Sequence, residues 1–153
     1  MDGVSSVAIQ TRWLEPRDYE IVCRIEEESE IFRPWKKEEL FAVLRRDEYV
    51  GMVAQEGRRV VGFMVYKLNP DSIELVKLGI REKARGRKIE HELIRWLKTK
   101  LNPVGRDKLV YFVREGELST LRYLRSVGFN AVGVRRGYFE DTEEDAFQME
   151  YRA

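Results

Sequence analysis

Residues Ile73 to Ile80 have the sequence Ile-Glu-Leu-Val-Lys-Leu-Gly-Ile, and the basic residues Arg85-Gly86-Arg87-Lys88 follow a short polar link. The first stretch is typical of a largely buried β-strand, and an amphipathic helix is expected directly after the basic residues. A strand that leads through a positively charged loop to a helix N-terminus is an arrangement that proteins use to hold a phosphate group. This stretch therefore predicts a fold of strands and helices with an anion site in the loop.

Hydrophobic periodicity predicts the remaining elements on both sides of this stretch. Six further strands are expected: Val7–Leu14, Tyr49–Gln55, Arg59–Leu68, Leu109–Val113, Phe129–Arg135 and Asp145–Tyr151. Four helices are expected: Arg17–Glu28, Lys36–Arg45, Arg87–Lys100, and a stretch marked by Leu118, Leu121, Leu124 and Val127. The third of these is expected to bury Ile89, Leu93, Trp96 or Leu97, and Leu101. Gly57 is expected to take a positive φ in a hairpin turn. Since hairpins give antiparallel neighbours and crossover helices give parallel ones, the order predicts a mixed sheet.

The bulk properties restrict the class of protein. The chain has 153 residues, which suits a single domain over 1–153, and its 28 Lys and Arg nearly balance its 27 Asp and Glu. This balance argues against nucleic acid and membrane surfaces as partners. No signal-like segment and no run of about 20 apolar residues is present, so a cytoplasmic location is expected. Because Cys23 is the only cysteine, neither a disulfide framework nor a structural metal site is expected.

Several segments share their order and spacing with one known family. They are Arg85 at the start of the loop, Ile25-Glu26-Glu27 with Phe32-Arg33-Pro34-Trp35, Val60-Val61-Gly62-Phe63, Gly128-Phe129, Arg135-Arg136-Gly137-Tyr138-Phe139, and Glu144-Asp145-Ala146 with Met149. Together they resemble the GNAT N-acetyltransferases over essentially the whole chain, and within them the ribosomal-protein alanine N-acetyltransferases of the RimI type. The resemblance implies the GNAT fold, an α/β (α+β) architecture with a mixed, mostly antiparallel seven-stranded sheet flanked by four helices.

The resemblance also implies an activity and a cosubstrate. Members of this family transfer acetyl from acetyl-CoA to a primary amine by direct attack, with no metal. The acceptor is here expected to be a protein N-terminal α-amine or a small-molecule amine, and both a monomer and a homodimer remain open. The positions that match the family's cosubstrate site are the backbone of Leu78, Gly79 and Ile80 for the acetyl and pantetheine groups, and the loop amides of Arg85, Gly86, Arg87, Lys88, Ile89 and Glu90 for the pyrophosphate.

The sequence departs from the family at the positions of the chemistry. Lys88 and Glu90 stand where the loop usually has small residues, and Phe112 stands where RimI-type enzymes have a glutamate proposed as general base. Leu124 stands where they have the tyrosine proposed as general acid, and Tyr123 is turned by about 100° around the helix from that position. An alternative is therefore a catalytically degenerate GNAT-fold module that binds a CoA species or a protein partner without turnover.

Three candidate catalytic residues follow, each with a competing structural explanation. Tyr123 is either a displaced acid or a packing residue, Tyr138 is either an acceptor-site wall or a hairpin cap in a polar loop, and Glu117 is one substitute base among several that include Glu74, Glu115 and Tyr111. A site without a strong base favours amines of low pKa, because an α-amine near about 8 is far more often neutral than a lysine near about 10.4. The acidic run from Glu26 to Glu30 is expected to be a solvated helix end.

Overall fold

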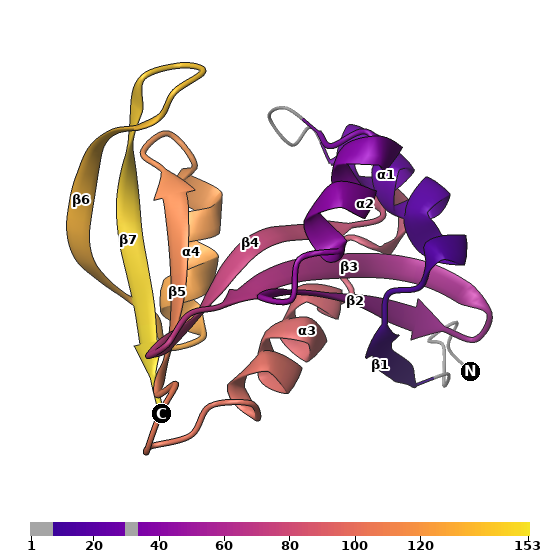
Figure 1. The fold of residues 1–153 in the computed structure, drawn as a ribbon, viewed down its shortest axis with the longest axis horizontal. Coiled ribbons are helices and arrows are strands. Elements are labelled where there is room, and N and C mark those ends of the chain that lie inside the picture. Colours follow the sequence, from indigo (N-terminus) through magenta and orange to yellow (C-terminus); the bar gives the residue numbers. More distant parts are fainter. Residues whose placement is uncertain (1–7, 30–33) are drawn as a thin grey trace. The chain divides into compact units, whose positions relative to one another are not determined.

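The computed structural model describes residues 8–29 and 34–153. In these ranges the strands are β1 (Ile9–Trp13), β2 (Tyr49–Glu56), β3 (Arg59–Leu68), β4 (Ser72–Ile80), β5 (Lys108–Arg114), β6 (Asn130–Phe139) and β7 (Glu144–Arg152). The α-helices are α1 (Tyr19–Glu28), α2 (Lys37–Leu44), α3 (Ile89–Lys98) and α4 (Leu118–Ser126), with single 3-10 turns at Pro16–Asp18 and Glu82–Ala84 (Figure 1). The strands follow the order β1-β2-β3-β4-β5-β7-β6, so the predicted mixed seven-stranded sheet with four helices is confirmed in the described residues.

The chain forms two compact units, and β4 contributes to both. Of the described residues, unit 1 contains 8–29, 34–66 and 77–99, and unit 2 contains 67–76 and 100–153. In unit 1, β1 and β2 pair antiparallel from Ile9–Glu56 to Trp13–Met52. Gly57 has φ +60° in the turn after β2, which confirms the predicted hairpin turn. Val7, predicted to start the first strand, lies outside the described residues.

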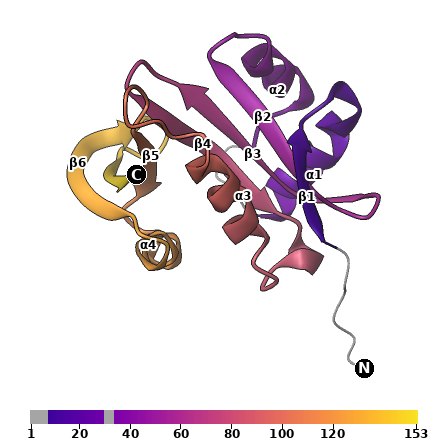
Figure 2. The same ribbon diagram turned by 90° about the horizontal axis from the view of Figure 1, so that it is seen from below.

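The helices of unit 1 cover both faces of its strands. Figure 2 shows α1 and α2 on one side of β2 and β3 and α3 on the other. Gly79 in β4 permits the close packing on the first side, because a Cβ placed there would lie 2.6 Å from the Phe63 ring and 3.2 Å from Ile25. A Cβ at Gly62 would meet Ile80 and Ile89 at 3.0–3.2 Å. Both glycines therefore let helices approach the sheet closely.

The apolar face of α3 differs in detail from the prediction. Its buried residues are Ile89, Leu93, Ile94 and Leu97, whereas Trp96 is half-buried and lies 6.1 Å from the Tyr66 ring. The expectation that Leu101 is buried in the same helix is wrong, because the helix ends at Lys98 and Leu101 is half-exposed. The helix was expected to begin at Arg87, but Arg87 and Lys88 belong to the loop, because Lys88 has a left-handed backbone conformation.

Unit 2 holds the parallel strand pair and the C-terminal hairpin. The start of β4 pairs parallel with β5 from Ser72–Lys108 to Leu75–Tyr111. β7 pairs antiparallel with both β5 and β6, and α4 lies beside β5 and β7 (Figure 1). The helix marked by Leu118, Leu121 and Leu124 is confirmed as α4; Leu124 is completely buried, whereas Leu118 is 60% exposed.

The sequence prediction missed the length of β6. Tyr138 and Phe139 were expected in a polar loop, but they are the last residues of this strand. Register irregularities between Ala131 and Gly133, and between Arg135 and Phe139, interrupt its pairing with β7, and Gly137 has φ +61°. Bulges of this kind hide a strand from a strict two-residue periodicity.

Candidate active site

The loop between β4 and α3 has two residues in the left-handed backbone region. Gly86 has φ +82°, and Lys88 has φ +61° and ψ +31° immediately before the first turn of α3. A lysine in this region costs about 1–2 kcal/mol relative to an ordinary conformation, whereas glycine adopts it freely. The backbone at Lys88 thus has the conformation that a glycine favours.

The backbone amides of this loop are arranged for an anion. In an α-helix the first amides have no acceptor within the helix, and Ile89 and Glu90 hold these positions in α3. The amides of Gly86 and Lys88 donate to no acceptor among the described residues, while the amide of Arg87 donates to the carbonyl of Ala84 at 3.4 Å. A set of such amides beside the positive end of a helix dipole fits the pyrophosphate of a CoA thioester.

Two of the basic side chains in this loop are already used within unit 1. Arg85 donates from Nη2 to the carbonyl of Glu28 at 2.8 Å. Arg87 makes a two-point contact with Glu56 of β2, in which Nη1 and Oε1 lie 2.9 Å apart. The exposed Lys88 has no ion-pair partner in the described part of the chain, so it is the loop cation best placed to reach a phosphate. Glu90, in the first turn of α3, opposes an anion there.

The end of β4 supplies the second part of the expected cosubstrate site. Leu78, Gly79 and Ile80 lie beyond the stretch of β4 whose register with β5 ends at Leu75. The carbonyl of Ile80 accepts a hydrogen bond from the Ser29 hydroxyl at 3.2 Å. All of the residues expected to hold acetyl-CoA, from Leu78 to Glu90, therefore belong to unit 1.

A buried ion pair lies directly before this segment, and the sequence did not predict it. Glu26 of α1 is completely buried and pairs with Lys77, whose side chain is 11% exposed. The other oxygen of Glu26 accepts a hydrogen bond from the amide of Trp35 at 3.0 Å, and the Lys77 ammonium lies 4.4 Å from the centre of the Trp35 ring. The expectation that Glu26 belongs to a solvated helix end is wrong for this residue, because α1 turns it inward with Val22 and Ile25.

Unit 2 contains a continuous series of stacked side chains, which we call the aromatic ladder: Arg135, Phe112, Tyr138, Phe139 and Arg114. The guanidinium carbon of Arg135 lies 5.4 Å from the Phe112 ring centre, and Phe112 and Tyr138 stack at 4.7 Å with 17° between their planes. Tyr138 meets Phe139 edge-on at 5.1 Å, and the Arg114 guanidinium lies 4.0 Å from the Phe139 ring centre.

The ladder holds Phe112, the residue that the sequence comparison predicts at the position of the RimI-type glutamate. Arg114 is held by Asp141, with contacts of 3.0 and 3.2 Å, and by Glu144 at 3.2 Å. Phe112 is half-buried within the stack, so its ring and the Tyr138 ring fill the space at this position. The structure thus places the candidate Tyr138 on Phe112, with 41% of Tyr138 exposed.

The other candidate catalytic residues of unit 2, Glu117 and Tyr123, lie at the start of α4 and within it. Glu117 precedes the first turn of α4. Partial desolvation raises the pKa of its carboxyl, the positive charge of Arg114 acts in the opposite direction, and the negative charge of Glu144 adds to the rise. Burial raises the pKa of Tyr111, and the charge of Glu117 adds to that effect. Tyr123 is half-buried with a buried hydroxyl oxygen, and its neighbour Leu124 is a core residue.

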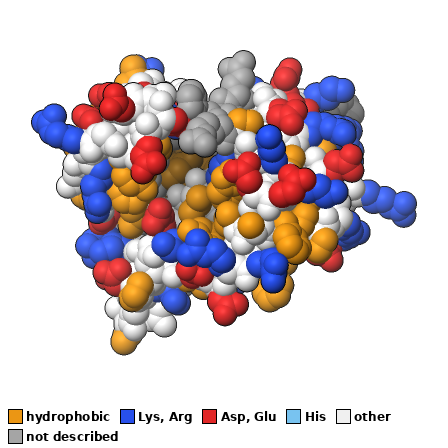
Figure 3. Space-filling view, turned by 45° about the horizontal axis from the view of Figure 1, so that its top comes forward, with side chains coloured by type: hydrophobic (Ala, Val, Ile, Leu, Met, Phe, Trp, Pro, Cys, Tyr) orange, Lys and Arg blue, Asp and Glu red, His pale blue; other side chains and the backbone are white. Residues whose placement is uncertain are grey.

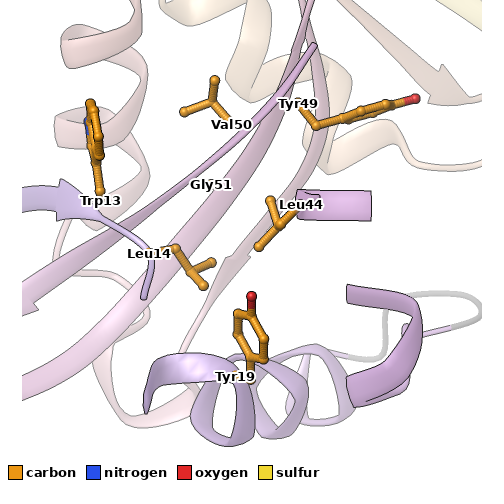
Figure 4. A pocket seen from close by; sticks show the side chains of 7 residues that line it. All are labelled: Trp13, Leu14, Tyr19, Leu44, Tyr49, Val50 and Gly51. Atoms are coloured by element: carbon orange, nitrogen blue, oxygen red, sulfur yellow. The ribbon is translucent and has the colours of Figure 1, made fainter. Parts of the chain in front are cut away.

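A separate apolar cavity of about 300 Å³ lies in unit 1 at the opposite end of β2 from Glu56. Figure 4 shows Leu14, Tyr19 and Leu44 converging on it below the backbone of Gly51. The remaining lining residues are Trp13, Tyr49 and Val50. Since this lining has no charged side chain, the cavity does not suit a pyrophosphate, and it is distinct from the loop at Arg85 to Glu90.

The described ranges contain neither a cluster of metal-ligating side chains nor a helix suited to a membrane. No group of three or more His, Cys, Asp or Glu residues in these ranges is arranged to hold a metal ion. No helix in the same ranges combines the length and the apolar character that a bilayer crossing requires. On the face drawn in Figure 3, Lys and Arg side chains are interspersed with Asp and Glu.

Comparison with known proteins agrees with this geometry. A model of the acetyltransferase (GNAT) family matches residues 9–129, which include β1, the loop, α3 and α4. The chain belongs to the GNAT acetyltransferase family. This membership confirms the resemblance in the sequence and assigns the chain to the GNAT-type acetyltransferases.

Individual relatives make the assignment within GNAT more specific. The chain is 32% identical over 108 residues to N-alpha-acetyltransferase RimI of Mycobacterium tuberculosis; the match covers 67% of this chain and 65% of that protein, just under two-thirds of its length. It is 25% identical over 138 residues to [ribosomal protein bS18]-alanine N-acetyltransferase of Escherichia coli, a match that covers 89% of this chain and 92% of that protein.

Two solved structures share the fold of this chain. The crystal structure of the ribosomal-protein-S18-alanine N-acetyltransferase from Escherichia coli has a TM-score of 0.81 at 22% identity, with 95% of this chain and 94% of that chain covered. Ard1 from Thermoplasma volcanium has a TM-score of 0.82 at 19% identity, with 96% and 99% covered.

Sequence reasoning missed the Glu26–Lys77 pair, although one signal for it is present. Lys77 shares the two-residue alternation of Ile73, Leu75 and Gly79, all of which are buried in β4. A lysine on the inward face of a strand requires an acidic partner. The partner is the glutamate of α1 that follows the buried Ile25.

Proposed function

We propose that this protein transfers an acetyl group from acetyl-CoA to a primary amine of low pKa, with a protein N-terminal α-amine as the preferred acceptor. The observation that carries the proposal is the backbone of the loop, where Gly86 and Lys88 adopt left-handed conformations and the first amides of α3 remain available to an anion. Family membership and the names of the relatives support the reaction class.

The residues of unit 1 have distinct roles in this proposal. The amides from Gly86 to Glu90 would hold the pyrophosphate, and the Lys88 ammonium would add a point charge. The backbone of Leu78, Gly79 and Ile80 would orient the thioester carbonyl. Bound acetyl-CoA supplies an activated acetyl group that an amine attacks directly, so most of the acceleration would come from orientation and backbone hydrogen bonds.

The aromatic ladder explains why the acceptor should have a low pKa. A general base contributes about 10²–10⁴ to a rate, and Phe112 cannot act as one. An α-amine is partly neutral at pH 7 without help, whereas a lysine side chain is about a thousandth neutral. The enzyme should therefore discriminate against lysine by its protonation state, before any contact with the rest of the acceptor.

The test combines binding with turnover. Calorimetry with acetyl-CoA should give a Kd in the micromolar range, and release of free CoA thiol should depend on an added amine. A peptide that begins with alanine is the first acceptor to use, because the Escherichia coli relative is named for alanine acetylation. The matched control is the same peptide with a blocked N-terminus and one internal lysine.

The outcomes separate the proposal from the degenerate module. Acetylation of the free N-terminus, with a much slower reaction at the lysine, would support the enzyme. Micromolar binding of acetyl-CoA without acetylation of any amine would identify a module that binds CoA without turnover. Absence of heat at millimolar acetyl-CoA would overturn the proposed enzyme and the CoA-binding form of the module, and would leave a module that binds a protein partner.

A further inference from the structure

The C-terminal turn of α1 contacts the end of β4 and the following loop at several successive points. The Glu26 carboxylate pairs with Lys77, and the Ser29 hydroxyl donates to the carbonyl of Ile80. Glu28 is used twice, since its carboxylate accepts from the amide of Glu82 at 3.1 Å and its carbonyl accepts from Arg85 at 2.8 Å. We call the residues Glu26, Glu28 and Ser29 the α1 anchor.

The pair at the start of the anchor also holds a residue from beyond α1. Both oxygens of Glu26 are occupied, one by Lys77 and the other by the backbone amide of Trp35. The Trp35 ring lies over the Lys77 ammonium as a cation–π contact. Trp35 comes just before α2. It therefore contacts both members of a buried ion pair, and one of them, Lys77, directly precedes Leu78 in β4.

We infer that Glu26 and Lys77 are positioning residues that couple Trp35 to the backbone of β4 where the thioester is to be held. The inference rests on the proposed use of Leu78 to Glu90 by acetyl-CoA. The pair is poor as a purely stabilising device, because apolar residues of similar volume would fill this space without the desolvation of two charges. Its geometry suits position control instead, since each charge has partners on different elements.

The coupling has a physical consequence for ligand binding. A ligand that restrains the loop and the end of β4 also restrains the α1 anchor, and through Glu26 it changes the surroundings of the Trp35 ring. The indole is close enough to the Lys77 charge for its fluorescence to report this change.

The experiment makes Trp35 the only tryptophan by the substitutions Trp13→Phe and Trp96→Phe. Titration with CoA should change the Trp35 emission, with a midpoint that matches the calorimetric Kd. Lys77→Met and Glu26→Gln in this background should remove the emission change, while the Kd for CoA shifts by less than about 3-fold because the loop amides remain. With the alanine peptide as acceptor, kcat should fall by about 10-fold or more, as expected when a group that holds the reacting geometry is lost.

Glu27→Gln is the matched control, because Glu27 is the exposed neighbour of Glu26 on the same turn. It should keep both the emission change and kcat. The double variant Glu26→Gln/Lys77→Met guards against misfolding, since it leaves no unpaired buried charge; it should fold cooperatively and still lack the Trp35 response. Two results would overturn the inference and leave the proposed function intact. One is CoA binding without a change in Trp35 emission, and the other is an emission change that persists when Glu26, Lys77 or both are substituted. No calorimetric binding of CoA would overturn both.

Discussion

Glu26 and Lys77 form an ion pair in which the carboxylate is completely buried and the ammonium nearly so. Burial raises the pKa of Glu26 and lowers the pKa of Lys77, and the hydrogen bond and attraction between them only partly offset these shifts. Both shifts mean that the protein disfavours the charged form of each side chain more than water does. The pair is therefore maintained at an energetic cost, and each member depends on the other.

This dependence predicts non-additive effects on stability. Lys77→Met should lower the free energy of unfolding by about 3–5 kcal/mol because it leaves the Glu26 charge buried without its partner, whereas Glu26→Gln/Lys77→Met should lie within about 1 kcal/mol of the parent or above it. Urea denaturation of the parent, both single variants and the double variant measures the coupling. Additive losses would show that the two charges do not act as a pair.

The same variant should have an unusual pH dependence. Without Lys77 the pKa of Glu26 rises further, and a carboxyl whose folded pKa is raised contributes stability that is complete below its unfolded pKa, about 4.3. That contribution to stability is lost as the pH rises through the pKa of Glu26 in the folded protein. The difference in unfolding free energy between the parent and Lys77→Met should therefore grow from pH 4 to pH 7.

Asp18 gives the opposite pH dependence. Burial tends to raise its pKa, but two hydrogen bonds from Arg12, at 2.8 and 3.0 Å, and one from the amide of Glu15 lower it overall. Stability from this carboxylate is present above the unfolded pKa, about 3.9, and is lost as the pH falls through the folded value. Asp18→Asn should lower the unfolding free energy at pH 7 by about 1.5–3 kcal/mol, with the difference vanishing in acid. Asp47→Asn, at an exposed position in the turn before β2, is the control.

The sequence was sufficient for the elements that follow a regular period. The strand Ile73 to Ile80, the loop and the helix after it were predicted within two residues, because apolar alternation and a 3.6-residue repeat meet at the basic stretch. The bulged β6 was cut short at Arg135, since Gly133 and Gly137 interrupt its period.

The side-chain networks were harder to predict, for a different reason. Glu26 lies in an acidic run that composition alone assigns to solvent, and only its position one residue after Ile25 on the inner face of α1 distinguishes it. The ladder joins β5 to the end of β6, and such contacts between distant segments leave no local pattern. Phe112 could be identified as a departure from the family, but its stacking on Tyr138 could not.

Phe112→Glu tests whether the ladder has replaced a base. The substitution breaks the stack on Tyr138, which should cost about 0.5–1.5 kcal/mol of stability beyond the lost apolar burial. It also places a carboxylate at the position predicted from the sequence to match the RimI-type glutamate, so acetylation of the alanine peptide below pH 7 should rise by up to about 10²-fold. The pH–rate profile of kcat/KM measures this gain.

Phe112→Gln is its matched control, because it breaks the same stack with a side chain of similar size and no basic group. If Phe112→Glu and Phe112→Gln give the same pH–rate profile, the position has no role in proton transfer. A gain confined to the glutamate variant at low pH would show that the parent works without a base there.

Glu90 is the residue of the loop whose removal should improve ligand binding. Its carboxylate lies in the first turn of α3, where it stabilises the helix without ligand but repels a pyrophosphate held by the same amides. Glu90→Gln should tighten the Kd for acetyl-CoA by about 2- to 5-fold and lower the unfolding free energy by about 0.3–1 kcal/mol. Glu92→Gln is the control, because Glu92 is in the same turn but its carboxylate is paired with Arg95 at 2.6 Å. Calorimetry at two salt concentrations checks the mechanism, since the gain should shrink as salt screens the repulsion. A Kd that is unchanged or weaker in Glu90→Gln would show that the pyrophosphate does not lie at this helix end.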